Sequence, residues 1–242
     1  MPEGPSLIYI SLKLKPFSGK KVTGCGGYTP MATGWIKGEK LLEVCTWGKH
    51  LLLRFKKGTV RIHLMLFGSV LINEKKKVNA SFFLQFGKDE VNFYVVKAIQ
   101  LTQPLKDIYD WRTDIMSRKW SSKHIIRLAG EHITEIIGDT LLDQQVFTGV
   151  GNIIRNEVLF RTAVHPLSRV GNIPVVKLLE LLKDIRVYAK LFLKEKKAGI
   201  FGDHFEVHEQ KICPRDGNEL TIKIIGKTKR KAYFCNSCQE KF

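Results

Sequence analysis

The stretch 138-GDTLLDQQVFTGVGNIIRNEVLF-160 decides the fold of the central part of this 242-residue chain. Its apolar residues recur at helical spacing on both sides of the turn Thr148-Gly149-Val150-Gly151-Asn152. Two such patterns around a short turn are typical of a helix–turn–helix unit. Backbone N–H groups at the start of the second helix can bind a phosphate, and Asn152 can add a side-chain hydrogen bond. The turn alone leaves open an ordinary helix connection, in which Gly caps the first helix and Asn the second.

Helical periodicity continues on both sides of this stretch, from about Pro104 onward. Ser121 or Ser122 precedes the first apolar repeat and is a suitable N-cap. The sequence therefore predicts a helical region here. The expected helices cover residues 121–130, 131–147, 151–164 and 174–197.

The residues before this region predict strands. Short runs rich in Val, Ile, Phe and Tyr are separated by Gly and charged residues, a pattern typical of a sandwich or a barrel. Leu7, Ile10 and Leu14 share one face of an opening helix expected over residues 6–15. The expected strand regions are residues 22–29, 40–55, 59–72, 80–86 and 91–102.

The charge of the chain indicates a polyanionic partner. Lys and Arg total 40 against 23 Asp and Glu, which gives a formal net charge of +17. Such a surface attracts nucleic acid and makes binding dependent on salt. The sequence has no apolar run long enough for a membrane span, and its N-terminal segment lacks the pattern of a secretory signal. We therefore expect a cytoplasmic, nucleoid-associated protein.

The last part of the chain carries half of a zinc ribbon. Cys235-x-x-Cys238 is a strong metal-binding pair, but the other half reads Cys213-Pro-Arg-Asp216 where a second Cys is expected. Asp216 has the expected spacing, so it ranks slightly ahead of His208, a softer ligand five residues before Cys213. We expect a structural Zn²⁺ here, because a unit this small needs a staple.

The N-terminus reads Met1-Pro2-Glu3-Gly4-Pro5. A residue as small as Pro2 permits removal of Met1, which exposes a secondary amine. Such an amine attacks an aldehyde-level carbon and forms an iminium, and Glu3 beside it can transfer protons. Taken alone, this pentapeptide favours an unremarkable terminal proline, so a catalytic interpretation depends on the rest of the chain.

Taken in order, these segments resemble the Fpg/Nei family of bifunctional DNA glycosylases. The resemblance runs the whole length of the chain. Its segments are Pro2–Pro5, Gly48-Lys49, His63-Leu64, Leu141–Gln144 with Gly149–Ile153, and the terminal cysteines. Apart from the first, each segment is weak alone, but the ordered set is highly specific.

The resemblance implies an α+β multidomain fold with three parts. The first is an N-terminal β-sandwich catalytic domain over residues 1–108. The second is a helix–two-turn–helix DNA-binding domain over residues 109–205, and the third is a zinc-finger β-hairpin over residues 206–242. In the family, DNA lies in the cleft between these parts.

The resemblance also implies a mechanism. In the family, the N-terminal proline attacks C1′ of a nucleotide that has been flipped out of the duplex, and the resulting Schiff base undergoes β- and δ-elimination. Carried over to this chain, Pro2 is the nucleophile and Glu3 is the acid/base. Lys49 matches a family lysine that donates a proton and contacts phosphate.

Three further residues match DNA-binding positions of the family. Asn152 matches the phosphate-binding Asn, and Arg230, five residues before Cys235, matches the finger arginine that holds the flanking phosphates. Leu66 matches the position of a wedge that fills the void left by the flipped nucleotide. The implied partner is double-stranded DNA containing oxidised bases or abasic sites, bound by a monomer.

Two absences favour the endonuclease VIII (Nei) branch. The short stretch Glu195–Glu206 leaves no room for the long loop that covers an oxidised purine, and the Arg-Arg-Phe segment of the Fpg branch has no match near Asn92–Leu101. We therefore expect oxidised pyrimidines as substrates. The alternatives are a formamidopyrimidine/8-oxoguanine glycosylase of the same family and a non-catalytic damaged-DNA-binding protein. A zinc-ribbon transcription accessory protein would leave the sequence before residue 110 unexplained.

Overall fold

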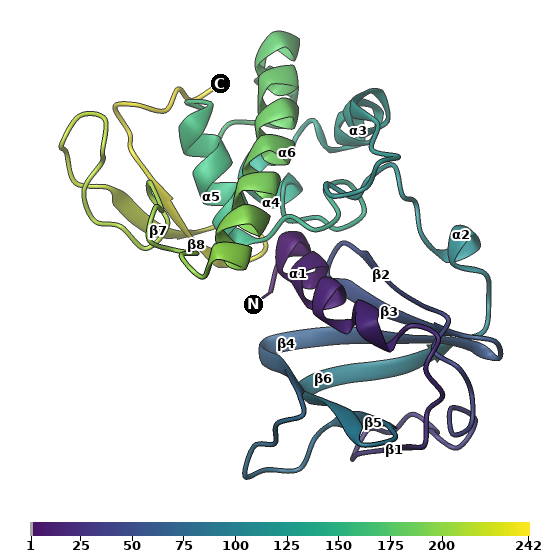
Figure 1. Ribbon diagram of the computed structural model, residues 1–242. Coiled ribbons are helices and arrows are strands. Elements are labelled where there is room, and N and C mark those ends of the chain that lie inside the picture. The colour runs from purple at the N-terminus through teal and green to yellow at the C-terminus, as the bar shows by residue number, and fades with distance from the viewer. Residues whose placement is uncertain (1) are drawn as a thin grey trace. The chain divides into compact units, whose positions relative to one another are not determined.

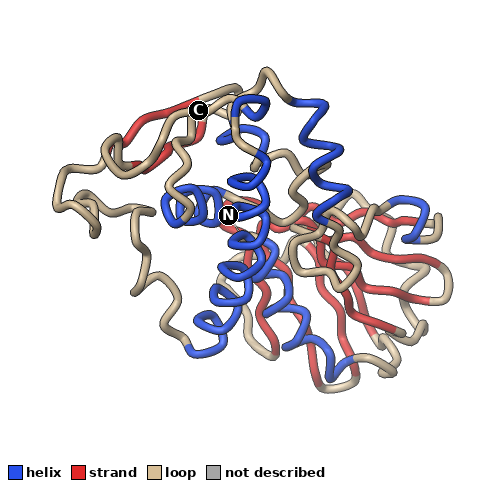
Figure 2. The backbone as a smooth tube through the Cα atoms, turned by 90° about the horizontal axis from the view of Figure 1, so that it is seen from above, coloured by secondary structure: helices blue, strands red, loops and turns tan. Residues whose placement is uncertain are grey.

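The computed structural model describes residues 2–242 of the chain. These residues form two compact units, Met1–Asp110 and Trp111–Phe242. Most strands belong to the first unit and most helices to the second (Figure 1, Figure 2). Met1 lies outside the described residues, so the expected removal of this residue stays a prediction.

The first unit is an antiparallel sheet with one long helix packed against strands β2 and β3. The order of its six strands is β1-β5-β6-β4-β3-β2. The helix begins at Gly4, two residues before the expected start, because Pro5 is well suited to a first helical turn. The elements are α1 (Gly4–Leu14), η1 (Lys15–Phe17), β1 (Gly24–Gly26), β2 (Glu43–Trp47), β3 (His50–Phe55), β4 (Gly58–Ile72), β5 (Phe82–Phe86), β6 (Asp89–Leu101) and α2 (Leu105–Ile108).

An irregularity in the two longest strands divides the sheet into two halves. β4 pairs with β6 as far as Leu64, and the pairing resumes at Ser69. On β6, Val95 lies at this break with φ 52, which a branched residue rarely adopts. Strands on both sides of the break line one apolar core, to which Ile62 contributes from one side and Phe93 from the other. The β-sandwich that the resemblance implied is therefore present.

The second unit joins the helical region and the C-terminal hairpin. Its apolar core includes Val158 of the central helix and Leu181 and Phe192 of the longest helix. Its elements are α3 (Ser122–Ala129), η2 (Gly130–His132), α4 (Ile137–Thr140), α5 (Asn152–Arg161), η3 (Val170–Asn172), α6 (Val175–Ala198), β7 (Thr221–Ile225) and β8 (Arg230–Phe234).

The boundary of the two units lies close to one predicted domain boundary. The first unit ends at Asp110, near the expected boundary at residue 108. The expected boundary between residues 205 and 206 divides elements that the structure groups in one unit. Among residues 2–242, no helix has the length and apolar character that a membrane span requires.

The prediction of a long helix over residues 131–147 is wrong. This segment contains only the turn η2 and the four-residue helix α4, followed by further turns. The N–H groups of Ile137 and Gly138 donate to the carbonyl oxygens of Ser168 and Pro166, at 2.9 and 3.0 Å. Because these donors are used by another segment, the helical pattern cannot continue backwards through them.

The helices α3 and α5 begin after different kinds of N-cap residue. Ser121 is the N-cap of α3, and its hydroxyl accepts a hydrogen bond from the His124 N–H at 3.3 Å. The N-cap of α5 is Gly151, and Asn152 is the first helical residue. The side chain of Asn152 therefore does not cap α5, and its nitrogen donates to the Lys231 carbonyl instead.

Candidate functional site

The carboxylate of Glu3 is buried at the start of α1. Glu3 is the N-cap residue of this helix, and its backbone carbonyl accepts hydrogen bonds from Ser6 and Leu7 at 2.8 and 3.2 Å. The residue is only 2% exposed. Pro2, which precedes it, is half-buried. The helix start therefore holds the predicted nucleophile and the predicted acid/base next to each other in the chain.

Lys49 lies in the tight turn between β2 and β3. Trp47 pairs with His50, so the turn has the two central residues Gly48 and Lys49. Gly48 has φ 50, as the first position of a type II′ turn requires, and glycine meets this requirement at little cost. Lys49 is 9% exposed, which is unusual for a lysine. Since α1 packs against β2 and β3, Glu3 and Lys49 come from neighbouring elements of one unit.

Two histidines beside this turn were given no role by the sequence-based prediction, although His63 belongs to one of the segments that carry the resemblance. His50 and His63 are paired across β3 and β4, and their ring centroids are 5.6 Å apart. Burial lowers the pKa of His50 to about 4. Burial also lowers the pKa of His63, against a hydrogen bond with the Lys49 backbone. Both rings are therefore neutral at pH 7, and the His63 ring links the Lys49 backbone to β4.

A sequence signal for His63 was present in β4. Buried Val60, Ile62 and Leu64 alternate with Arg61 and His63, as expected for a strand with one apolar and one polar face. A search for polar residues on that second face would have identified them.

Leu66 lies in the irregular part of β4, where pairing with β6 is interrupted. Met65, Leu66 and Phe67 are 46%, 54% and 77% exposed. Three consecutive exposed apolar side chains are uncommon on a soluble surface, and exposed apolar patches often serve as contact sites. The prediction named Leu66 alone, and the structure adds its two neighbours.

Asn152 at the start of α5 contacts Lys231, the residue after Arg230. The Asn152 side-chain nitrogen donates to the carbonyl oxygen of Lys231 at 3.0 Å. The guanidinium of Arg155, which is fully buried, donates to the same oxygen at 2.6 Å. The N-terminus of α5 is thereby joined to β8, whose first residue is Arg230.

The turn of the β7–β8 hairpin is held by one carboxylate. Asp139 of α4 accepts hydrogen bonds from the Lys227 N–H at 2.7 Å and from the Thr228 hydroxyl at 2.8 Å. Gly226 at this turn has φ 63, and a Cβ there would collide with the Asp139 carboxylate. The basic turn is therefore fixed in the unit by contacts that need these residue types.

Four donor side chains gather at the base of the hairpin. The thiols of Cys235 and Cys238 lie 3.2 and 3.3 Å from Oδ2 of Asp216, and the Cys213 and Cys238 sulfurs are 3.8 Å apart. One ligand atom of each of the four residues lies within 4.8 Å of the others. Tetrahedral zinc with Zn–S bonds of about 2.3 Å places its sulfurs about 3.8 Å apart. The four residues therefore fit a metal ion of this kind.

The carboxylate of Asp216 is suited to act as a ligand. The Cys213 thiol, and then the Asn218 N–H, lower the pKa of this carboxyl well below its usual range. The Asn218 side chain also donates to Oδ2 of Asp216 at 3.0 Å. An outer hydrogen bond of this kind orients a metal-binding carboxylate.

His208 does not belong to this group of donors. The His208 ring nitrogen Nδ1 lies 2.9 Å from the side-chain nitrogen of Asn156. The backbone N–H of His208 donates to the buried carboxylate of Glu157 at 2.8 Å. Burial lowers the pKa of His208 to about 4. The structure thus brings Asp216, rather than His208, to the three cysteines.

Comparisons with known proteins agree with this architecture. The N-terminal domain of formamidopyrimidine-DNA glycosylase matches residues 1–98, and the H2TH domain of the same enzyme matches residues 118–200. The chain therefore belongs to the Fpg/Nei family of DNA glycosylases. Within this family it is a member of the endonuclease VIII-like branch, as its similarities to individual proteins indicate.

Two curated relatives illustrate these similarities. Endonuclease 8-like 3 of Mus musculus is 31% identical over 223 residues, which cover 86% of this chain and 37% of the relative. Endonuclease 8-like 2 of Homo sapiens is 30% identical over 196 residues, which cover 74% of this chain and 57% of the relative. The chain spans little more than a third of the length of the endonuclease 8-like 3 relatives that it matches.

The fold is also shared with solved structures. Formamidopyrimidine-DNA glycosylase of Lactococcus lactis, bound non-covalently to DNA containing an AP site, superposes with a TM-score of 0.86. The two chains are 18% identical, and the match covers 99% of this chain and all of the other. At this identity the likeness establishes the fold alone.

Proposed function

We propose that this protein is a base-excision-repair DNA glycosylase with AP lyase activity. It removes oxidised bases, chiefly pyrimidines, and cuts the strand by β,δ-elimination. The observation that carries the proposal is the buried carboxylate of Glu3, which directly follows Pro2 at the start of α1. Membership of a family of DNA glycosylases supports the same function.

The first step forms a covalent bond at Pro2. The lone pair of the free amine attacks C1′ of the damaged nucleotide, and the glycosidic bond breaks with its electron pair moving to the base. The base takes up a proton as it leaves. The amine loses its proton, the sugar ring opens with a proton transferred to O4′, and an iminium remains. Elimination of the 3′ and then the 5′ phosphate leaves a one-nucleotide gap in the strand, and water then hydrolyses the iminium, which releases the sugar fragment and regenerates the free amine.

Glu3 and Lys49 move the protons in this scheme. Glu3 transfers a proton to the opening sugar and later accepts one during elimination. Lys49, which the Gly48 turn holds at the sheet edge beside α1, donates a proton and neutralises a phosphate. Because both side chains are nearly buried, they act where water competes weakly for the same protons.

The remaining predicted residues bind DNA in this proposal. Arg230 and the N-terminus of α5 around Asn152 hold phosphates of the damaged strand. Leu66, with its exposed neighbours, fills the space left by the flipped nucleotide. The group of Cys213, Asp216, Cys235 and Cys238 holds a structural Zn²⁺, which supplies folding energy to the hairpin rather than chemistry.

The trapping of the covalent intermediate tests the nucleophile. Borohydride should reduce the iminium on abasic or thymine-glycol DNA and link the protein to the strand through Pro2. A Pro2→Gln variant retains Met1 because its second residue is bulky, and we expect it to lose trapping. Pro5→Ala, which changes the other proline of the same segment, is the matched control. Normal trapping by the Met1-retaining variant would exclude the amine assignment.

An activity panel tests the substrate class and the alternatives. We expect cleavage of thymine-glycol, dihydrouracil and abasic duplexes, and weak cleavage of 8-oxoguanine duplexes. Preferred cleavage of 8-oxoguanine would support the formamidopyrimidine-type alternative instead. Salt-sensitive binding without cleavage of any damaged duplex would identify a non-catalytic DNA-binding protein.

Two further expectations belong to the same proposal. The protein is expected to act as a monomer, which size-exclusion chromatography with light scattering can measure. It is expected to work in the cytoplasm on nucleoid-associated DNA, which imaging of a tagged protein in its own cell can test.

A further inference from the structure

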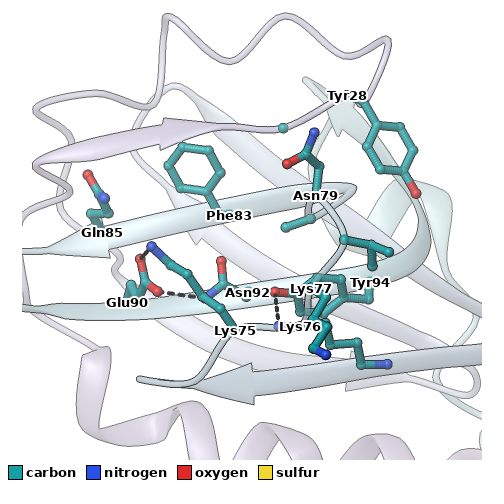
Figure 3. Close-up of a pocket in the computed structure, with 13 residues that line it drawn as sticks. Tyr28, Lys75, Lys76, Lys77, Asn79, Phe83, Gln85, Glu90, Asn92 and Tyr94 are labelled. Carbon is teal, nitrogen blue, oxygen red and sulfur yellow. Dashed lines mark hydrogen bonds and ion pairs between the residues drawn. The ribbon is translucent and has the colours of Figure 1, made fainter.

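A second feature of the first unit is a pocket at the sheet edge opposite the Lys49 turn. The pocket has a volume of about 500 Å³ and lies between β1, β5 and β6 and the segment that follows β4 (Figure 3). In the strand order, β1 and β2 are the two outermost strands. The pocket is therefore separate from Glu3 and Lys49, which lie by β2 and β3. Its volume is typical of sites for small molecules, which measure about 300–1,000 Å³.

The charge of the lining favours an anion. Lys75, Lys76 and Lys77 line the pocket together with one carboxylate, that of Glu90. The Lys75 ammonium lies 3.2 Å from Glu90, so this pair is largely neutral. The Lys76 ammonium lies 5.1 Å from the centroid of the Tyr94 ring. Positive charge from Lys76 and Lys77 therefore remains for a ligand.

The loop that carries these lysines is anchored rather than loose. The backbone N–H of Lys76 donates to the hydroxyl of Tyr94 at 2.9 Å. The side chain of Asn92 donates to the Glu74 carbonyl at 3.0 Å. Both Asn92 and Tyr94 are nearly buried in β6. The lysines are thus presented from a fixed backbone, which reduces the entropy that a ligand must overcome.

The pocket also offers aromatic faces. Tyr28 is 65% exposed, and its hydroxyl is bonded to the Ser81 side chain at 2.7 Å. Phe83 also lines the pocket, beneath β1 in the view of Figure 3. A Cβ at Gly26 would lie 2.9 Å from the Phe83 ring, and a Cβ at Gly27 would collide with the Ser81 backbone. These glycines let the chain approach closely, so that the backbone at Gly26 packs against the edge of the Phe83 ring in place of a side chain.

Lysines beside aromatic rings and side-chain amides match the chemistry of a nucleotide. A base can stack on an aromatic ring, amides such as that of Gln85 can bond its edge, and ammonium groups can bind its phosphate. We propose that this pocket binds a nucleotide, with its base against Tyr28 or Phe83 and its phosphate against Lys76 and Lys77. The nucleotide is free or is part of an unpaired DNA strand. This inference does not depend on the nucleophile at Pro2.

Photo-crosslinking locates the bound base. The probe is an oligothymidylate of about ten nucleotides that carries one 5-iododeoxyuridine, a length within the span of a single-strand binding surface. The full-length protein is irradiated with the probe, and the attached peptides are identified by mass spectrometry. We expect attachment at Tyr28 or Phe83. Attachment only at peptides outside the pocket overturns the proposal.

Affinity measurements then test the groups. Tyr28→Ala should weaken binding of the labelled probe about tenfold through lost stacking, whereas Tyr28→Phe should bind normally. Lys76→Gln/Lys77→Gln should weaken binding and reduce its salt dependence. The control Lys40→Gln/Lys56→Gln removes two exposed lysines outside the pocket. Equal losses in the two double variants would contradict the pocket.

Competition separates the two sources of the nucleotide. If thymidine 5′-monophosphate prevents crosslinking at Tyr28, the pocket accepts a free nucleotide. If only the strand binds, it takes an unpaired DNA segment, and both results support the proposal. Borohydride trapping on abasic duplex should be unchanged in Tyr28→Ala. A failure of trapping in the unaltered protein therefore concerns the proposed function and leaves this pocket open to test.

Discussion

The β-sandwich and the β7–β8 hairpin are stabilised in different ways. The sandwich buries a continuous apolar core, to which α1 and the strands on both sides of the interruption in the β4–β6 pairing contribute. The hairpin leaves Ile222 and Ile224 of β7 47% and 60% exposed. It buries a small apolar cluster of Ile225, Ala232 and Phe234. It is also held by Asp139 at its turn, by Arg155 along β8 and by the donor group at its base. A general apolar pattern specifies the first region, whereas the second depends on a few individual side chains.

The largest effect is expected from the donor group of the hairpin. Asp216→Ala removes one of four ligands and should reduce bound zinc from about one per chain to well below half. His208→Ala is the matched variant and should keep its zinc, because His208 lies outside the donor group. Metal analysis of the purified variants measures both. Stoichiometric zinc in Asp216→Ala would show that the carboxylate is not a ligand.

A core truncation in the sandwich should be large but metal-independent. Phe93 is fully buried and stacks on Phe82 with ring centroids 5.5 Å apart. Phe93→Ala should lower the free energy of unfolding of the first unit by about 3–5 kcal/mol. Chemical denaturation, followed by a spectroscopic signal from the first unit, measures this loss of unfolding free energy. Metal analysis checks that zinc is retained. Loss of zinc on this change would break the distinction between the two regions.

A smaller effect is expected at the hairpin turn. Asp139→Ala removes the acceptor of the Lys227 N–H and the Thr228 hydroxyl and should cost about 1–3 kcal/mol. It should also increase hydrogen exchange at the turn. Glu131→Ala is the control, since the Glu131 side chain is 60% exposed and forms a surface ion pair with Arg127. If both variants exchange alike, Asp139 does not fix the turn.

The smallest effect is a dependence of sandwich stability on pH. The pKa of His50 is about 4 in the folded unit because of burial, against about 6.5 in an unfolded chain. Between these values the unfolded chain binds more protons. Stability is therefore complete above about pH 6.5 and falls as the pH decreases toward 4.

The urea midpoint of the first unit measures this dependence. It should be lower at about pH 5 than at about pH 7.5, and His50→Phe should reduce the difference while keeping the ring beside Tyr109. His204→Asn, at a side chain 63% exposed in the second unit, should leave it unchanged. An unaltered pH slope in His50→Phe would assign the dependence to other groups.

The same contrast explains what the sequence could predict. Strand regions were predictable because apolar residues alternate, and the donor group was predictable because Asp216 has the spacing of a ligand. The helix over residues 131–147 was predicted wrongly, since partners at Ser168 and Pro166 decide the local structure and lie far along the chain. Local patterns carry no information on such partners.

The candidate catalytic residues were reached by a different route. Pro2 and Glu3 carried a weak signal by themselves, and the ordered motifs of a family gave them a role. His50 and His63 were given no role because a histidine in a strand is common, and their pairing requires the register of β3 and β4. The basic pocket also depends on register, since it forms where β1 pairs with β5.

The carbonyl oxygen of Lys231 couples the position of β8 to that of α5. It accepts one hydrogen bond from the first residue of α5 and another from a buried guanidinium one turn further along the same helix. α5 and β8 are therefore linked through a single oxygen atom, so a displacement of one element also displaces the other. In the proposed complex, a force on Arg230 from a bound DNA strand would therefore also act on the start of α5, and the spacing between Arg230 and Asn152 would be kept.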